Sequence, residues 1–375
     1  MPYPYRSYVT VSRERIARNY RAIRQAAGPG VEIAGVVKAN AYGHGAAEVS
    51  RVLVNEGARW LAVSSVEEGV ALREAGIGAR ILVLAGFLPH EAEAVAAFDL
   101  TPALPSLEDI AAVDRLARAC GRPLPYHLKL DTGMGRLGTV AEAGAIAAAV
   151  ASAPHARLEG VMSHFASAAD FTSTQTAEQV SRFQAVVEGL RASGIAPDFV
   201  HLAATDGMAY AGGQPFGNMT RPGLALYGYV SRAKGDAPPC ALDVAPALSW
   251  KARILCVKDV PASAALGYGA TFRAPRPMRI AVAGAGYADG IFRCLSNRGC
   301  VIAAGRLSPM LGSVCMDLIT VDVTHAPALA AGDEVTLLGE ENGVTLDAAQ
   351  IADAAGTIAY EVLCAIGLRV RRVYI

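Results

Sequence analysis

The chain has 375 residues, of which 53% are apolar and 18% are charged, which suits a large, well-buried domain accompanied by a smaller one. Thirty-four Lys and Arg residues balance thirty-four Asp and Glu residues, and this neutrality argues against nucleic acid or an anionic membrane as the main partner. No segment approaches the roughly 18 uninterrupted apolar residues of a membrane span, and residues 1–16 lack the apolar core of a secretory signal.

The cysteines bear on the compartment. Seven of them are scattered along the chain, and none forms a C-x-x-C pair. We therefore expect reduced thiols rather than disulfides, no zinc or other metal site, and a soluble cytoplasmic protein.

Residues 31–228 alternate between short apolar runs and Ala-, Glu- and Arg-rich segments with helical spacing. The apolar runs predict buried strands at 31–38, 60–65, 80–86, 100–104, 126–132, 158–165, 198–204 and 221–228. Segments such as 65–76 and 106–121 predict helices between them. Strands that are apolar throughout and separated by helices indicate a parallel sheet covered on both faces, and eight such units favour a (β/α)8 barrel over an open sheet.

The composition changes after about residue 235. Residues 234–240 (KGDAPPC) predict a linker, and Val-, Thr- and Gly-rich runs follow at 278–287, 318–324 and 333–340. These runs predict strands, with one helix at 346–356 that begins in the region of Thr345 and Asp347. We predict an α/β protein in which residues 10–235 form a (β/α)8 TIM-type barrel, residues 236–375 form a mostly-β C-terminal domain, and residues 1–9 join that β domain.

The stretch VVKANAYGHG at 36–45 places Lys38 at the end of the first predicted strand. In a (β/α)8 barrel the chemistry lies where strands end and the following loops begin. Desolvation there lowers the pKa of a lysine, and a neutral amine can form an imine bond with an aldehyde, which is how pyridoxal 5′-phosphate (PLP) is anchored. Gly43 and Gly45 then predict close approach of the backbone to a bulky cofactor, and Tyr42 offers a hydroxyl to its phosphate.

Other polar residues lie on the predicted strands: Lys129 and Asp131 end the fifth, His164 ends the sixth, His201 falls on the seventh and Arg221 enters the eighth. Singly, each has an ordinary interpretation, since strand-end lysines commonly extend to water and lone histidines commonly belong to a core. Together on one barrel mouth they predict a site. Backbone N–H groups around Gly223 and a helix that begins near Thr205 would bind a phosphate.

Several motifs resemble those of alanine racemases, in the same order along the chain: VVKANAYGHG, HLKLDTGMGRLG, SHFASAAD, RPGLALYG, GYGATF, GYADG and VCMD. The resemblance continues to TIAYEVLCAIGLRVRRVY near the C-terminus and covers essentially the whole chain. It implies a PLP-dependent enzyme of fold type III that interconverts L- and D-alanine with two bases. It also implies that the product D-alanine supplies cell-wall peptidoglycan.

The resemblance implies a role for individual residues. Lys38 would hold PLP covalently, and Tyr268 would be the second catalytic base. The remaining implied cofactor contacts are Tyr42, His201, Thr205, Arg221, Gly223, Leu224 and Tyr360. Within this set, Arg221 would face the pyridine nitrogen and His201 would pack against the pyridine ring.

The resemblance also implies substrate-binding and supporting residues. Arg136 would lie near the substrate carboxylate, while Met316, Asp317 and Tyr287 would come from the partner subunit of a homodimer with shared active sites. His164 would orient Tyr268. Lys129 matches a lysine that is often carbamylated and that neutralises Arg136.

Three positions depart from the family pattern. Ala204 and Thr205 stand where Asn-Ser is usual, and Arg371 stands where proline is common. Threonine keeps the hydroxyl but adds a methyl group and a stiffer χ1 torsion.

Other functions stay open from the sequence. They are a racemase of serine or of broader specificity, a catabolic alanine racemase, an amino-acid decarboxylase of similar architecture, a PLP-homeostasis protein and a non-catalytic regulator. Arg221 argues against a decarboxylase, which typically places a carboxylate at the pyridine nitrogen. The β domain and Tyr268 argue against the last two.

Overall fold

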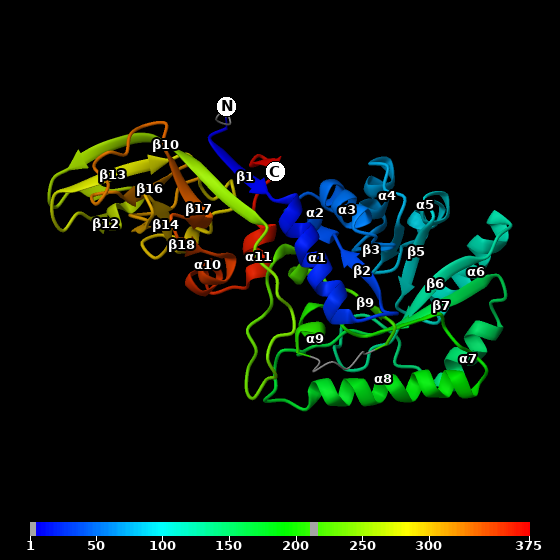
Figure 1. Ribbon diagram of the computed structural model, residues 1–375. Coiled ribbons are helices and arrows are strands. Elements are labelled where there is room, and N and C mark those ends of the chain that lie inside the picture. Colours follow the sequence, from blue (N-terminus) through cyan, green and yellow to red (C-terminus); the bar gives the residue numbers. More distant parts are fainter. Residues whose placement is uncertain (1–4, 211–216) are drawn as a thin grey trace. The chain divides into compact units, whose positions relative to one another are not determined.

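A computed structural model describes residues 5–210 and 217–375, which form two compact units (Figure 1). The barrel unit comprises Ile16–Ala41 and the described part of Ala46–Ala245. The β unit comprises the described residues up to Arg15, the short segment Tyr42–Gly45, and Pro246–Ile375.

The barrel unit is built on a parallel sheet that, within the described residues, contains eight strands in the order β8-β7-β6-β5-β4-β3-β2-β9. The strands are β2 (Glu32–Val36), β3 (Trp60–Val63), β4 (Arg80–Val83), β5 (Leu100–Leu104), β6 (Leu124–Lys129), β7 (Ala156–Met162), β8 (Phe199–His201) and β9 (Met219–Thr220). A parallel bridge between Ala204 and Arg221 joins the segments that follow β8 and β9, and so closes the barrel. The predicted (β/α)8 architecture is confirmed.

Helices alternate with these strands (Figure 1). They are α1 (Arg13–Ala27), α2 (Lys38–Tyr42), α3 (Ala46–Asn55), α4 (Val66–Glu74), α5 (Ala92–Ala97), α6 (Glu108–Cys120), α7 (Ala143–Ala151), α8 (Gln175–Ala192) and α9 (Thr205–Ala209), with 3₁₀ turns η1 (Pro89–Glu91) and η2 (Leu224–Tyr227). Helix α6 illustrates the packing: Ile110, Val113 and Ala117 are buried at helical spacing on one face. Gly121 follows in the left-handed conformation that ends many helices.

The β unit is organised around the long strand β10 (Leu248–Val260), which pairs with three others in antiparallel fashion. Those partners are β1 (Ser7–Val11), β13 (Met278–Ala283) and β17 (Glu334–Glu341). The other elements are β11 (Ala265–Leu266), β12 (Phe272–Arg273), β14 (Cys300–Ala303), β15 (Arg306–Pro309), β16 (Ile319–Asp322), β18 (Val344–Leu346), β19 (Arg371–Tyr374), α10 (Ala348–Ala355), α11 (Ala359–Cys364), η3 (Tyr268–Ala270) and η4 (Arg293–Leu295).

The predicted C-terminal helix is present as α10, and its start is determined locally. Asp347 accepts a hydrogen bond from the backbone N–H of Gln350, whose side chain accepts one from the Asp347 backbone N–H. This reciprocal pair satisfies two donors that a helix start leaves unpaired.

Three predicted strand positions were wrong. Strand β2 ends at Val36, so Lys38 opens helix α2 instead of ending the strand, and β7 ends at Met162, two residues before His164. Arg221 follows β9, and the predicted strand 221–228 contains a 3₁₀ turn. Short buried apolar runs have the same hydrophobic pattern in a strand and in a turn, so periodicity alone could not separate them.

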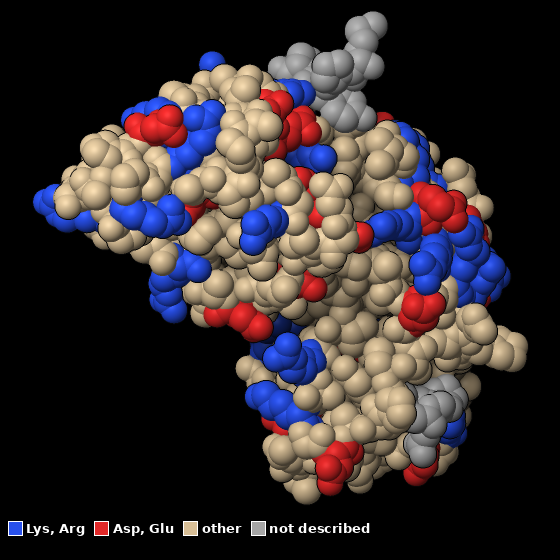
Figure 2. All heavy atoms as spheres, turned by 60° about the vertical axis from the view of Figure 1, so that its left-hand side comes forward, with Lys and Arg blue, Asp and Glu red and all other residues tan. Residues whose placement is uncertain are grey.

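On the molecular face shown in Figure 2, acidic and basic side chains lie interspersed among uncharged residues. Within the part of the chain that the structure describes, every helix is too short or too polar to cross a bilayer.

Candidate active site

Lys38 begins a single turn of left-handed helix. Residues 39–42 all have φ values between 50° and 54°, a conformation that costs a non-glycine residue roughly 1–2 kcal/mol. Glu68 supports the turn, because one carboxylate oxygen accepts from the backbone N–H of Ala39 at 2.6 Å and the other from that of Ser64 at 2.7 Å. Asn40 adds a hydrogen bond from the Ala46 N–H. Strained backbone held in this way is common at functional sites.

Cationic and potentially cationic groups gather at the carboxyl ends of the barrel strands. Lys129 is buried, and its pKa is lowered to about 8 by burial first and then by the charges of Arg221, Arg136 and Lys38. The pKa of His164 falls to about 3, again through burial first and then through the same neighbouring charges. The structure therefore brings these five residues together, and His164 is neutral at neutral pH.

The loop that carries Arg136 is pinned at its base by Asp131. One carboxylate oxygen of Asp131 accepts hydrogen bonds from the backbone N–H groups of residues 133–135 at 3.0–3.1 Å. The two chain ends of the loop are joined where the Thr139 N–H donates to the Lys129 carbonyl. At Gly138 a side chain would meet the Asp131 backbone nitrogen at 2.5 Å, so the loop closes only around glycine.

Arg221 is buried, and its guanidinium is directed by fixed acceptors. Nη1 donates to His201 Nδ1 at 2.7 Å, and Nη2 donates to the carbonyls of Ser163 and Leu202 at 2.6 and 3.1 Å and lies 3.3 Å from His164 Nδ1. Burial lowers the pKa of Arg221 to about 9, so the group stays cationic at neutral pH. Among the residues that the structure describes, none accepts from Nε or from the second Nη1 hydrogen, so both can donate to a further acceptor.

The hydroxyl of Thr205 connects the first turn of α9 to the first turn of η2. Thr205, the first residue of α9, accepts hydrogen bonds on Oγ1 from the backbone N–H groups of Gly223 and Ala225, at 3.1 and 3.2 Å. Leu224 opens η2, so its N–H has no partner within that turn. The arrangement presents a hydroxyl hydrogen and a turn N–H together, and such donor sets suit a phosphate.

Within the β unit, the residues predicted to reach the site of a partner subunit lie on joined loops. The backbone N–H of Tyr287 donates to the carbonyl of Cys315, and that of Ala288 donates to the carbonyl of Met316. Arg369 contacts Asp317 at 2.8 Å while it pairs with both oxygens of the buried Asp289. These contacts bring together three of the predicted residues: Tyr287, Met316 and Asp317.

Tyr268 is on a neighbouring loop of the same unit. Its carbonyl accepts from the Ser313 hydroxyl at 3.1 Å, three residues before Met316. The Tyr268 side chain is 76% exposed, and the side chains of Tyr287 and Met316 are also exposed. Large apolar groups that gather in this way mark surfaces that contact a ligand or another protein.

The segment after Lys38 contains Tyr42, one of two tyrosines predicted to contact the cofactor, and two glycines whose predicted role was wrong. The rings of Tyr42 and Tyr360 lie 5.7 Å apart within the β unit. Gly43 and Gly45 were predicted to accommodate a cofactor, but in the structure they accommodate protein groups. A side chain at Gly43 would meet the Leu363 carbonyl at 2.5 Å, and one at Gly45 would overlap the hydroxyl of Tyr374.

Two family models cover nearly the whole chain. The N-terminal domain of alanine racemase matches residues 11–231, and the C-terminal domain of alanine racemase matches residues 247–374. The chain belongs to the alanine racemase family. This family is one of isomerases, and both of its domains are present here in the order expected.

Individual relatives agree with the family assignment. An alanine racemase of Halothermothrix orenii is 40% identical over 358 residues, which are 95% of this chain and 93% of the relative. The crystal structure of alanine racemase from D-cycloserine-producing Streptomyces lavendulae matches with a TM-score of 0.92 at 33% identity, over 100% of this chain and 98% of that one. The alanine racemase of Bartonella henselae, solved with covalently bound pyridoxal phosphate, matches with a TM-score of 0.88 at 29% identity, over 99% and 100% of the two chains.

A second set of polar residues lies inside the barrel, around His127, Glu159 and Arg80, and was not predicted from the sequence. One signal was available in the sequence. Successive side chains on a strand alternate between its two faces, so His127, two residues before Lys129 on β6, lies on the same face as Lys129. Glu159 gave no comparable signal, because its position depends on how β7 aligns with β6.

Proposed function

We propose that this protein is a PLP-dependent enzyme that interconverts L-alanine and D-alanine with two bases. Lys38 at the barrel mouth and Tyr268 on an exposed loop of the β unit carry the proposal, since each stands in its own family motif. The exposed side chains of Tyr287 and Met316 are available to contact a substrate.

The barrel residues fit PLP by their chemistry. Thr205 and the backbone at Gly223 and Leu224 would bind the phosphate, Arg221 would donate to the pyridine nitrogen, and Lys38 would form the covalent link. When bound, PLP delocalises the charge that develops as the α-proton leaves. Because a guanidinium only donates hydrogen bonds, Arg221 would leave the pyridine nitrogen unprotonated and so moderate that delocalisation.

Each base would act on its own face of the substrate. Lys38 would move a proton at Nζ, and Tyr268 would move one at Oη. A tyrosine has a reference pKa of about 10, so the Tyr268 phenolate needs cationic and hydrogen-bonding support. His164 would supply the hydrogen bond: its Nδ1 faces Arg221, so the neutral ring carries its proton on Nε2 and donates from there. Arg136 would add positive charge and hold the substrate carboxylate.

Lys129 would be carbamylated and would neutralise Arg136. Support comes from its burial among three cations, which disfavours the ammonium form and leaves an amine able to react with carbon dioxide. The enzyme would act as a homodimer in the cytoplasm, with Tyr268, Tyr287, Met316 and Asp317 entering the site of the partner subunit. The D-alanine formed would supply peptidoglycan.

The function is tested on the purified, PLP-loaded protein with a panel of L-amino acids, beginning with L-alanine. We expect the circular dichroism signal of L-alanine to decay to zero as the racemate forms, and serine to react more slowly. Release of carbon dioxide with formation of the corresponding amine, and no D-amino acid, would instead identify a decarboxylase. Protein that neither racemises nor decarboxylates any amino acid would contradict the proposal.

Thr205 gives a prediction about cofactor affinity. Thr205→Val keeps the side-chain shape but leaves the Gly223 and Ala225 N–H groups without their acceptor, which costs about 1–3 kcal/mol for each unpaired group. We expect PLP to bind Thr205→Val at least about tenfold more weakly than the parent, because 1.4 kcal/mol corresponds to tenfold. The affinity is measured by absorbance titration of the apo-protein.

Thr205→Ser is the matched control, because it restores the hydroxyl that family members usually carry. Its affinity for PLP should stay within about threefold of the parent, which corresponds to less than 1 kcal/mol. Equal affinities of the Val and Ser variants would show that the hydroxyl does not organise the phosphate loop.

A further inference from the structure

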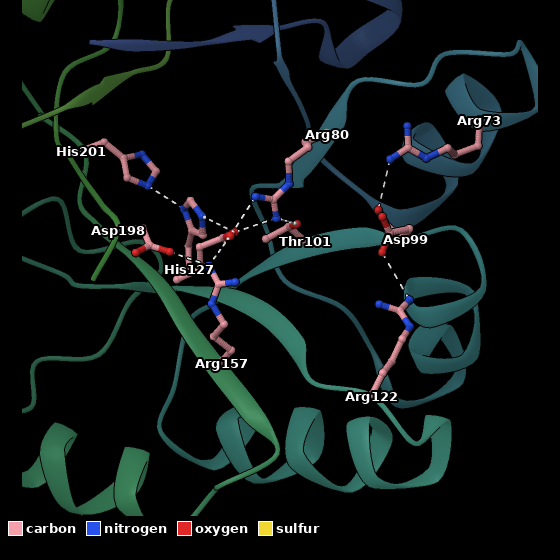
Figure 3. A network of polar contacts seen from close by, with 10 residues as sticks. Arg73, Arg80, Asp99, Thr101, Arg122, His127, Arg157, Asp198 and His201 are labelled. Carbon is pink, nitrogen blue, oxygen red and sulfur yellow. Dashed lines mark hydrogen bonds and ion pairs between the residues drawn. The ribbon is translucent and has the colours of Figure 1, made fainter. Parts of the chain in front are cut away.

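A chain of buried polar groups runs from Arg221 into the barrel. His201 Nδ1 lies 2.7 Å from Arg221 Nη1, and His201 Nε2 lies 2.7 Å from His127 Nδ1. His127 Nε2 then lies 3.5 Å from Glu159 Oε2, a close electrostatic contact in which no hydrogen bond is formed. Figure 3 shows His201 and His127 in line, with Arg80 and Arg157 converging on the carboxylate beside His127. All four members of the chain are at least 97% buried.

The far end of this chain is an ionised carboxylate. Arg80 donates to both oxygens of Glu159 at 2.8 Å, and Arg157 donates to Oε1 at 3.0 Å. Burial raises the pKa of Glu159, but the contacts and charges of His127 and Arg80 outweigh it and lower that pKa to about 2. At neutral pH Glu159 can therefore only accept hydrogen bonds.

The two ends allow one arrangement of protons. Arg221 only donates, so the His201 Nδ1 that faces it must be unprotonated, and the proton of the neutral ring sits on Nε2. His201 Nε2 then donates to His127 Nδ1, which leaves the His127 proton on Nε2, directed at Glu159. Starting from Glu159 gives the same answer. Burial lowers the pKa of both histidines, so each ring is neutral.

The surroundings of His127 fix the direction of its ring. Trp60 and Phe199 pack against it at centroid distances of 5.5 and 5.8 Å. Gly160 lies against the ring, where a side chain would meet His127 Nδ1 at 2.6 Å. The ring therefore cannot turn its nitrogens away from His201 and Glu159 without displacing these neighbours.

The sheet register explains how Glu159 reaches this position. On β6 and β7, Tyr126 is paired with Leu158 and His127 with Gly160, so Glu159 is an extra residue at an irregularity in the ladder. Such irregularities redirect a side chain and often lie beside active sites.

We propose that Glu159 and His127 are positioning residues for Arg221. The ionised carboxylate of Glu159 allows a single tautomer in His127 and, through it, in His201. In that tautomer His201 Nδ1 is the acceptor that orients the Arg221 guanidinium. The inference rests on the proposed function only where it assigns Arg221 to the pyridine nitrogen. It predicts that a substitution of His127 on β6 or of Glu159 on β7 alters the environment of the bound cofactor, although neither residue would contact that cofactor.

The tautomers are tested directly on the PLP-loaded enzyme labelled with ¹⁵N-histidine. Long-range ¹H–¹⁵N correlation spectra distinguish protonated from unprotonated ring nitrogens, and single variants assign the seven histidines. We expect both His127 and His201 to be neutral with the proton on Nε2. A proton on Nδ1 of either ring, or a doubly protonated ring, would overturn the proposal whether or not the enzyme is active.

A pair of substitutions at position 127 tests the positioning role. His127→Phe keeps an aromatic ring in the Trp60 and Phe199 cage but offers no acceptor to His201, whereas His127→Gln offers a carbonyl oxygen. We expect His127→Phe to lower kcat for alanine by about tenfold or more, as partners that orient a site histidine commonly do, and to shift the absorption band of bound PLP. His127→Gln should recover most of both, and KM should change little in either variant.

Glu159→Gln replaces the carboxylate at the end of the chain, which can only accept hydrogen bonds, with an amide that can also donate. Asp114→Asn is its matched control. Asp114 is likewise a buried barrel carboxylate that contacts an arginine and a histidine, Arg118 and His155, away from Arg221. We expect Glu159→Gln to mix the His201 tautomers and shift the PLP band, and Asp114→Asn to do neither, even where both lower thermal stability. Identical effects of the two variants, or equal behaviour of His127→Phe and His127→Gln, would reduce the chain to a packing role and overturn the proposal.

Failure of the proposed function can be distinguished from failure of this inference. A wild-type protein with the predicted tautomers but no racemisation of alanine would contradict the function and leave the chain of buried polar groups standing.

Discussion

Replacing Lys38 with alanine should lower kcat for alanine racemisation by at least about 10³-fold, because a single positioned acid–base group contributes about 10²–10⁴-fold and this one would also anchor the cofactor. The left-handed turn after Lys38 does not depend on the lysine side chain, since Glu68 and Asn40 contact the backbone. The variant should therefore fold. Circular dichroism of L-alanine measures the rate, and thermal unfolding of the apo-protein checks the fold.

Lys234→Ala is the matched control, since Lys234 is an exposed barrel lysine 3.9 Å from Asp170. It should retain the parental rate. Borohydride treatment of the PLP-loaded parent should leave the label on the peptide that contains Lys38, and treatment of Lys38→Ala should leave none. Persistent racemisation by Lys38→Ala, or labelling of a different lysine, would remove Lys38 from the mechanism.

Mixing inactive Lys38→Ala and Tyr268→Ala subunits should restore about a quarter of the parental activity. In a shared-site homodimer, random exchange makes half of the dimers mixed, and each mixed dimer contains one site with both bases intact. The motivation lies in the β unit, where Tyr268 is 76% exposed and its loop is hydrogen-bonded to the one that leads to Met316. Such a tyrosine is available to a second copy of the chain.

Exchange is confirmed by placing different affinity tags on the two variants and recovering doubly tagged dimers. If Tyr268 served the site of its own subunit, every site in the mixture would lack one base and activity would stay at background. Mixtures of two differently tagged Tyr268→Ala preparations should likewise stay inactive. No recovery in doubly tagged dimers of the two different variants would reject the shared site.

Much of the fold followed from local sequence. Seven of the eight barrel strands described and helix α10 were predictable because an apolar run, a helical period or a capping pair such as Asp347 and Gln350 depends on residues near one another in the chain. The gathering of Lys38, Lys129, His164 and Arg221 was predictable for a related reason. Parallel strands of a barrel bring their carboxyl ends to one mouth, so positions late in each strand converge.

Backbone conformation at the site was harder to predict. Residues 31–38 and 221–228 were each predicted to form a strand, yet a left-handed turn begins at Lys38 and residues 221–228 contain a 3₁₀ turn. Four consecutive non-glycine residues with positive φ oppose their intrinsic preference, so the turn exists only because distant groups such as Glu68 hold it.

The sequence by itself determined the family motifs, the strand count and the residue types at the barrel mouth, because each depends on short stretches of chain. Only the tertiary structure decided that His127 lies between His201 and Glu159, and that Gly43 and Gly45 face protein groups. Those facts depend on the register of β6 against β7, on the packing around each ring, and on contacts between residues more than 70 positions apart. Proton positions in a buried chain follow from which donors and acceptors meet, and that is a property of the folded molecule.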